Sequence, residues 1–226
     1  MEFDRDLLKS ALKNGCDAFE IELNGSQVED FCRYAEILVE WNQKMNLTAI
    51  TEPAAVAVKH FTDSLLFTKA FELSGNERII DVGTGAGFPG IPLKIYKSGI
   101  ELTLLDTLNK RMNFLKEVSE QLNQDNECIH ARAEEQGRKK ESREQYDIAT
   151  ARAVAHLREL SEYCLPFVKV GGFFVSLKGY DIENELDEAK KAIELLGGKI
   201  ERVEKFILPD ESRRSIVIVK RSEERR

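Results

Sequence analysis

The chain has 226 residues, 42% of them hydrophobic and 32% charged, which fits one α/β domain with an additional segment. The formal net charge of −7 argues against nucleic-acid binding through bulk positive charge, although basic residues cluster locally in the second half. No apolar run approaches the roughly 20 residues that cross a bilayer, and no C-x-x-C pair indicates a zinc site or a disulfide framework. We expect a cytoplasmic protein with reduced cysteines, no metal and no membrane association.

Residues 1–75 are expected to form an N-terminal helical extension. The segment 26–29, SQVE, has the spacing of a capping box at a helix start. An apolar stripe at spacings of three and four follows it: Phe31, Tyr34, Leu38 and Trp41. After a polar break, Pro53 suits the first turn of another helix, which runs to about Phe71.

Residues 76–226 are expected to form a second domain, in which short apolar runs alternate with amphipathic stretches. Strands are predicted at 78–82, 101–105, 127–131, 146–151, 172–177, 199–208 and 215–221. Helices are predicted at 91–96, 109–122, within 156–166 and at 182–196, and 132–144 is predicted as loop or weak helix. This alternation predicts a parallel sheet with helices on both faces, and the last two strands suggest a hairpin with one antiparallel strand.

The loop after the first predicted strand, in IIDVGTGAGFPGIP (79–92), fits two small-ligand motifs. From Gly85 it fits the G-x-G-x-x-G dinucleotide motif. From Asp81 it fits D-x-G-x-G-x-G, which holds S-adenosyl-L-methionine (AdoMet). A carboxylate at Asp81 would repel a pyrophosphate but suits the ammonium and sulfonium of AdoMet, and Pro89 and Pro92 remove N–H groups that a pyrophosphate needs. We therefore favour AdoMet over a nicotinamide cofactor. Asp106, at the end of the second strand, would take ribose hydroxyls in either case.

Several segments together resemble one family more closely than a fold class. They are WNQKMNLTAITEP, HFTDSLL, IIDVGTGAGFPGIPLKI, DTLNKRMNFL, ARAEE and ATARAVAHL, in this order. The chain resembles the RsmG (GidB) family of bacterial 16S ribosomal RNA guanine-N7 methyltransferases over about residues 29–178. The resemblance implies a Rossmann-like, seven-stranded methyltransferase sheet of the α/β class with an N-terminal helical extension. It also implies AdoMet as cofactor and 16S rRNA or the small ribosomal subunit as partner.

The resemblance assigns site residues as well. It places Gly83, Gly85, Gly87 and Phe88 around the methionine part of AdoMet, and Asp106, Thr107 and Leu108 at the ribose and the adenine edge. Ala133 and Glu134 would flank the adenine. Arg152, after the fourth strand, would lie where the methyl donor meets the target base.

The residue types fit methylation of a ring nitrogen that carries no proton. A pyrimidine C5 target needs a cysteine nucleophile, usually beside proline, and no Pro-Cys occurs. An exocyclic amine usually calls for an Asn/Asp-Pro-Pro-aromatic loop after the fourth strand, where this chain has TARA (150–153). Guanine N7 offers an in-plane lone pair and requires only alignment and charge stabilisation. Arg152 is the predicted catalytic residue, which could donate to guanine O6, to a phosphate or to the AdoMet carboxylate, or form only a surface salt bridge.

Substrate-binding candidates lie mainly in the helical extension: Asn46, His60, Asp63, Ser64 and Lys178. His60 and Ser64 are four residues apart and share a helix face, although a lone histidine there is often structural, and Asn46 and Thr48 could instead cap the next helix. We expect this extension to cover the AdoMet site and help place the RNA, in a monomer. Alternatives are a methyltransferase with another substrate, a non-catalytic ribosome-assembly protein, and the disfavoured nicotinamide-dependent oxidoreductase.

Overall fold

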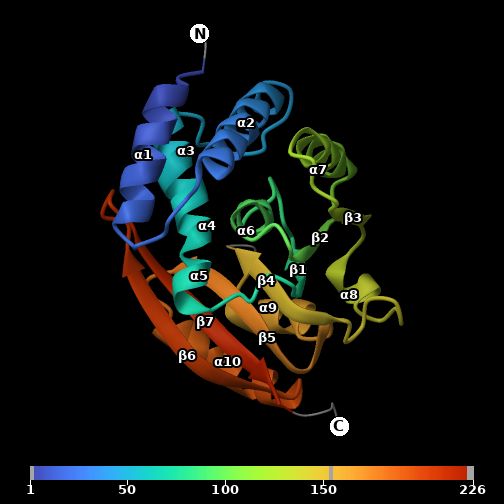
Figure 1. Ribbon diagram of the computed structural model, residues 1–226. Coiled ribbons are helices and arrows are strands. Elements are labelled where there is room, and N and C mark those ends of the chain that lie inside the picture. The colour runs from blue at the N-terminus through green and yellow to red at the C-terminus, as the bar shows by residue number, and fades with distance from the viewer. Residues whose placement is uncertain (1–2, 153–154, 223–226) are drawn as a thin grey trace.

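A computed structural model describes residues 3–152 and 155–222, and it places the helical extension against a single sheet (Figure 1). The extension contains α1 (Arg5–Asp17), α2 (Gly25–Asn42) and a helical run formed by α3 (Pro53–Val56), a π-helical turn η1 (Ala57–Thr62), α4 (Asp63–Leu65) and α5 (Phe67–Ala70). The predicted second helix is thus confirmed to Ala70, but its π turn was not predicted. Such turns carry i→i+5 hydrogen bonds and occur often at functional sites.

Helix α2 begins earlier than the sequence suggested. Its N-cap is Asn24, whose side chain accepts from the backbone N–H of Gln27 at 3.0 Å, while the Gln27 side chain accepts from Asn24 N–H at 2.8 Å. The predicted capping box at 26–29 is therefore wrong, because Asn24 and Gln27 form the box two residues earlier. The predicted apolar stripe is confirmed: Phe31, Tyr34 and Leu38 are fully buried, and Trp41 packs against the core.

Seven strands form the sheet, in the order β3-β2-β1-β4-β5-β7-β6. They are β1 (Arg78–Val82), β2 (Glu101–Asp106), β3 (Glu127–His130), β4 (Tyr146–Arg152), β5 (Val168–Gly179), β6 (Gly198–Ile207) and β7 (Arg213–Arg221). Strand β7 runs antiparallel to both of its neighbours, and the first five strands in the order pair in parallel. The predicted parallel sheet with one antiparallel strand is confirmed. Ala153, from the predicted segment after β4, lies outside the described residues.

Helices cover both faces of the sheet and create two cores (Figure 1). The extension, α6 (Gly90–Tyr96) and α7 (Asn109–Gln121) pack on one face, where the predicted stripe of α7 is buried: Met112, Leu115, Val118 and Leu122. On the other face, α9 (Leu157–Cys164) and α10 (Glu183–Leu195) cover a second core, and the short α8 (Ala133–Gln136) lies in the stretch expected as loop or weak helix. The chain therefore has helices on both faces, as its alternating pattern indicated.

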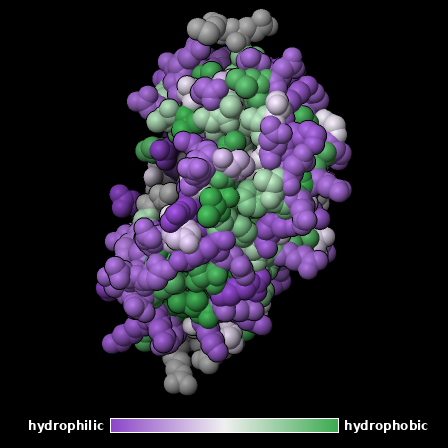
Figure 2. Space-filling view, turned by 90° about the vertical axis from the view of Figure 1, so that its left-hand side faces the viewer, coloured by the Kyte–Doolittle hydropathy of each residue, from purple (hydrophilic) through white to green (hydrophobic). Residues whose placement is uncertain are grey.

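The edge strand β6 is rich in charge: Lys199, Glu201, Arg202, Glu204 and Lys205. Figure 2 views the molecule from this side and shows polar residues over most of the face, with apolar residues gathered in its central part. Charged side chains on an edge strand oppose pairing with a strand of another molecule. At the other end of the order the parallel strand β3 forms the second edge of the sheet. The carboxyl ends of the five parallel strands lie on the same side of the sheet, where ligands of open α/β sheets bind.

Candidate active site at the glycine-rich loop

The loop between β1 and α6 turns sharply because three of its glycines adopt positive φ. The φ angles of Gly83, Gly85 and Gly87 are 68°, 60° and 92°. At Gly87 a Cβ atom would lie 2.5 Å from Ile91 Cδ1 and 2.7 Å from the Tyr34 hydroxyl. Only glycine fits both this backbone conformation and this close approach. The loop thus brings backbone N–H groups to the carboxyl edge of the sheet.

Asp81 holds this loop from beneath. Its side chain is completely buried, and Oδ2 accepts hydrogen bonds from Thr84 Oγ1 at 2.8 Å and from Gly90 N–H at 2.9 Å. Burial, more than any neighbouring charge, raises the pKa of this carboxyl to about 6. The sequence suggested a carboxylate facing the cations of AdoMet, whereas the structure places it behind the loop that it shapes.

A first cavity, of about 360 Å³, opens beside the loop at the carboxyl ends of β1, β2 and β3. Its lining residues come from these strand ends and from α7, α8 and α9: Val82, Gly83, Leu105, Asp106, Thr107, Arg111, Ala131, Arg132, Ala133, Glu134 and Tyr163. Asp106 is 3% exposed; Oδ2 accepts from Gly85 N–H at 2.9 Å and from Arg111 at 3.1 Å, and Oδ1 accepts from Leu108 N–H at 3.0 Å. The carboxylate therefore joins the end of β2 to the glycine loop and to α7.

A second cavity, of about 290 Å³, lies between the loop and the helical extension. Its lining residues are Leu47, Thr48, His60, Gly83, Thr84, Gly85, Ala86, Phe88, Arg111 and Arg152. Gly83 and Arg111 line both cavities. The two spaces therefore adjoin, and together they suit an elongated ligand with a nucleoside at one end.

Arg152, at the end of β4, is held in place by the helical extension. Its NH1 donates to Asp63 Oδ2 at 3.1 Å, to Ser64 Oγ at 3.3 Å and to the carbonyl oxygen of His60 at 3.4 Å. The guanidinium carbon lies 4.6 Å from the centre of the Phe88 ring, which is cation–π distance. Arg152 therefore connects the sheet, the glycine loop and the extension at a single point.

His60 is kept neutral in this cluster. Its ring stacks on Phe88 with centroids 4.5 Å apart, Nε2 lies 2.8 Å from Thr48 Oγ1, and Nδ1 lies 3.3 Å from Arg152 NH2. Burial, followed by the Arg152 charge, lowers the pKa of His60 to about 3. Because arginine can only donate, Nδ1 is assigned as the acceptor and Nε2 as the protonated nitrogen that donates to Thr48. Both ring nitrogens are thereby occupied.

Helix α2 also contacts the loop. The buried Tyr34 hydroxyl donates to the carbonyl oxygen of Ala86, and its ring lies 5.4 Å from that of Phe88. Gln27 Nε2 donates to the carbonyl oxygens of Ile95 and Tyr96 at the end of α6, at 3.3 and 3.0 Å. The extension thus fixes the loop from the side opposite the sheet.

Not every predicted site residue lines a cavity. Those that do are Gly83, Gly85, Phe88, Asp106, Thr107, Ala133, Glu134, His60 and Arg152. Asp63 and Ser64 lie behind Arg152, and Leu108 is 51% exposed at the start of α7. Lys178 is 9% exposed and bonded to the Ala155 carbonyl oxygen at 2.7 Å and to Glu185 at 2.8 Å, and Asn46 is exposed. Glu52, rather than Asn46 or Thr48, caps the next helix.

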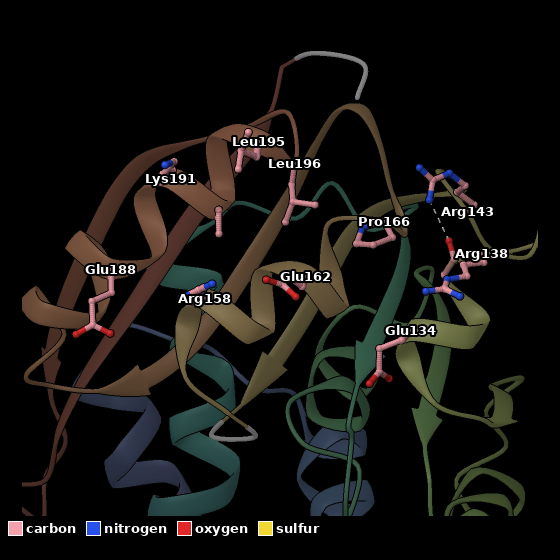
Figure 3. Close-up of a pocket in the computed structure, with 12 residues that line it drawn as sticks. Glu134, Arg138, Arg143, Arg158, Glu162, Pro166, Glu188, Lys191, Leu195 and Leu196 are labelled. Atoms are coloured by element: carbon pink, nitrogen blue, oxygen red, sulfur yellow. Dashed lines mark hydrogen bonds between the residues drawn. The ribbon is translucent and has the colours of Figure 1, made fainter. Parts of the chain in front are cut away.

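A larger hollow than these two cavities lies elsewhere. It measures about 720 Å³ and lies between α8, α9 and α10 (Figure 3). Figure 3 shows Arg138, Arg143, Arg158 and Lys191 around it, together with Glu134, Glu162 and Glu188. It reaches the first cavity only at Glu134. We assign the site to the two smaller cavities, because they contain the glycine loop and the strand ends that bind ligands in this type of sheet.

Sequence reasoning missed Arg111, Tyr163 and Arg214. Arg111 follows Asp106 by five residues, so its position near the start of α7 was a usable signal. Tyr163 reaches the first cavity from α9, and Arg214 reaches Asp63 from β7, 151 residues away in the sequence. No local pattern marks these two contacts.

Within residues 3–152 and 155–222, no helix is long and apolar enough to cross a membrane. The same residues contain no group of three or more His, Cys, Asp or Glu side chains that could hold a metal ion.

A seven-stranded sheet of this order, with a glycine loop after β1 and a carboxylate at the end of β2, defines an AdoMet-dependent methyltransferase. A methyltransferase from Pyrococcus furiosus has the same fold, with a TM-score of 0.56 at 17% identity over 70% of this chain and 81% of that one. So does geranyl diphosphate C-methyltransferase from Streptomyces coelicolor, solved with S-adenosyl-L-homocysteine, with a TM-score of 0.54 at 13% identity over 70% and 78% of the two chains.

The family is shown by the sequence itself. Residues 27–217 match the GidB family model, described as rRNA small subunit methyltransferase G. A ribosomal RNA small subunit methyltransferase G from Desulforamulus reducens is 50% identical over 216 residues, which are 95% of this chain and 90% of that protein. The chain therefore belongs to the GidB family.

Proposed function

We propose that this protein transfers a methyl group from AdoMet to N7 of a guanine in 16S rRNA of the small ribosomal subunit. The choice of guanine N7 as the methyl acceptor rests on the described side chains that line the second cavity. Its titratable side chains are His60, Arg111 and Arg152. The two arginines are cations, and His60 has a pKa of about 3 and both nitrogens occupied. This lining offers no base to remove a proton, and guanine N7 has none to lose.

The cofactor would occupy both cavities. The adenosine fits the first, with Asp106, Thr107 and Leu108 near the ribose and Ala133 and Glu134 near the adenine. The methionine part fits the second, along Gly83, Gly85 and Phe88, while Gly87 supplies the turn. Asp81 would contribute indirectly by fixing the loop. Bound AdoMet supplies the methyl group on a cationic sulfonium.

The protein's own residues would align the acceptor and set the charge around it. In an in-line transfer the N7 lone pair forms the new N–C bond as the C–S bond breaks, so positive charge passes from sulfur to the purine. The contacts to Asp63, Ser64 and His60 leave Arg152 Nε–H and one N–H of NH2 for the AdoMet carboxylate or guanine O6. The paired Asp63 carboxylate reduces the local positive charge that would otherwise oppose the cationic product.

The two segments of the chain would have different roles in the reaction. Residues 1–75 would act as a domain that covers the site and 76–226 as the methyltransferase domain. His60, Asp63 and Ser64 would order the acceptor side, and Asn46 and Lys178 would contact RNA at the rim. We propose a cytoplasmic monomer, consistent with a substrate found on the ribosomal small subunit.

The test is methyl transfer from labelled AdoMet to small ribosomal subunits from a strain that lacks this gene. Digestion and mass analysis should identify labelled 7-methylguanosine in 16S rRNA. Subunits from the parent strain, already methylated, are the matched control and should take up no label. Tight AdoMet binding without label in any RNA would overturn the proposed substrate and leave the cofactor assignment intact.

A further inference from the structure

The Asp63 carboxylate lies between two arginines that come from distant parts of the chain. Oδ2 accepts from Arg152 at 3.1 Å, and Oδ1 accepts from Arg214 Nε at 2.9 Å. The Asp63 side chain is 6% exposed, that of Arg152 14% and that of Arg214 25%. Each carboxylate oxygen thus has its own cation, which fixes the plane of the carboxylate.

Arg214 reaches this position because of its register in β7. It pairs with Gly179 of β5, and alternate residues of β7, Ile216 and Ile218, pack in the core beneath the helical extension. The Arg214 side chain therefore points to the face that carries α4, where Asp63 begins the helix. It lines neither of the two cavities.

Its neighbour Arg213 points to the opposite face. The Arg213 guanidinium lies 5.1 Å from the centre of the Tyr180 ring, and Val217 and Val219, in register with it, pack in the second core. Arg213 is exposed, and in the described part of the chain the hydrogen bonds of the Asp63 carboxylate come from Arg152 and Arg214. The two adjacent arginines thus differ in the face they occupy, which makes Arg213 a matched control for Arg214.

The charge of Asp63 depends on both partners. Burial is the largest effect and raises the pKa of the Asp63 carboxyl above its usual value, while the charges of Arg152 and Arg214 and their hydrogen bonds oppose this rise. Arg152 also contacts the neutral His60 and the Ser64 hydroxyl, both on the same helical run as Asp63. Without Arg214, burial would be opposed by one cation instead of two. The Asp63 carboxyl would then take up a proton at a higher pH, and its ion pair with Arg152 would be lost.

We infer that Arg214 is a positioning residue for methyl transfer: it orients Asp63 and keeps it charged, and Asp63 in turn holds the Arg152 guanidinium against Phe88 beside the second cavity. The inference rests on the proposed function, because it assigns Arg152 to the transfer step. Arg214 touches no part of the cofactor or acceptor cavities and acts entirely through Asp63.

The experiment compares Arg214→Gln, Arg214→Lys and Arg213→Gln in methyl transfer to undermethylated small subunits, over about pH 5.5 to 8.5. Arg213→Gln should behave as wild type. Arg214→Gln should lower kcat about tenfold near neutrality, with little change in KM for the subunit, and shift the acidic limb of the kcat profile to higher pH. Arg214→Lys restores the charge and should return the limb toward its wild-type position. Thermal unfolding of each variant verifies that it is folded.

Two results would overturn the inference. One is an Arg214→Gln profile that falls equally at every pH and is not restored by lysine, which indicates general loss of structure. The other comes from AdoMet affinity, which needs no RNA: Arg214→Gln and Asp63→Asn should each weaken binding, and the double variant no more than the worse single one. Additive losses would show that Arg214 does not act through Asp63. If wild type binds AdoMet but labels no rRNA, the proposed substrate fails, while this affinity cycle still decides the role of Arg214.

Discussion

The neutral, buried His60 predicts a specific dependence of stability on pH. The unfolded chain binds a proton on this imidazole below about pH 6.5, whereas the folded protein does so only near pH 3. Stability from His60 is therefore fully present above pH 6.5 and is lost as pH falls toward 3. At about 1.4 kcal/mol per pKa unit, acidification from pH 7 to 5 should cost about 2 kcal/mol of unfolding free energy through this residue.

The assay is urea unfolding of wild type, His60→Asn and the matched control His130→Asn at pH 7, 6 and 5. His130 is exposed on β3, so the control removes an imidazole from the surface. Asp81 acts in the opposite direction, because its pKa of about 6 lets the folded protein take up a proton over the same range. The difference between variants is therefore the test. His60→Asn should lose about 2 kcal/mol less than wild type between pH 7 and 5, and equal losses would refute the neutral His60.

Three further predictions concern the loop and the RNA. Asp106→Ala should weaken AdoMet binding more than RNA binding, measured by calorimetry and filter binding, because it removes the acceptor of Gly85 N–H at the cavity wall; equal losses would indicate misfolding. Gly87→Ala should destabilise the protein by roughly 1–3 kcal/mol in chemical unfolding, since its Cβ would lie 2.7 Å from the Tyr34 hydroxyl at φ 92°; an unchanged stability would contradict this crowding. With a net charge of −7, RNA affinity should depend only weakly on salt; a slope as steep as that of a strongly basic protein would rule out recognition through shape and a few cations.

The local patterns of the sequence were sufficient for the sheet and for the loop. Strands and helices could be predicted because their apolar side chains repeat every two or 3.6 residues along the sequence. The glycine loop and Asp106 follow the first two predicted strands, so parallel pairing of those strands was enough to place them close together at one edge of the sheet. The sequence did not predict the orientation of the Asp81 side chain or the contact between Arg214 and Asp63. Whether Asp81 faces the cavity or the space beneath the loop depends on the turn that Gly83 and Gly85 make. The contact between Arg214 and Asp63 joins residues 151 positions apart, and only the position of β7 in the sheet brings them together.

The order of the strands has a consequence for when the contacts around Arg152 can form. Strand β6 precedes β7 in the sequence, yet it reaches the rest of the sheet only through β7, which lies between it and β5. During synthesis the β6 segment emerges before β7, its pairing partner in the described sheet, and its charged side chains favour hydration of an unpaired strand. Strand β7 also carries Arg214. A chain in which β7 has not yet docked therefore lacks both the completed sheet and the Arg214 contact to Asp63.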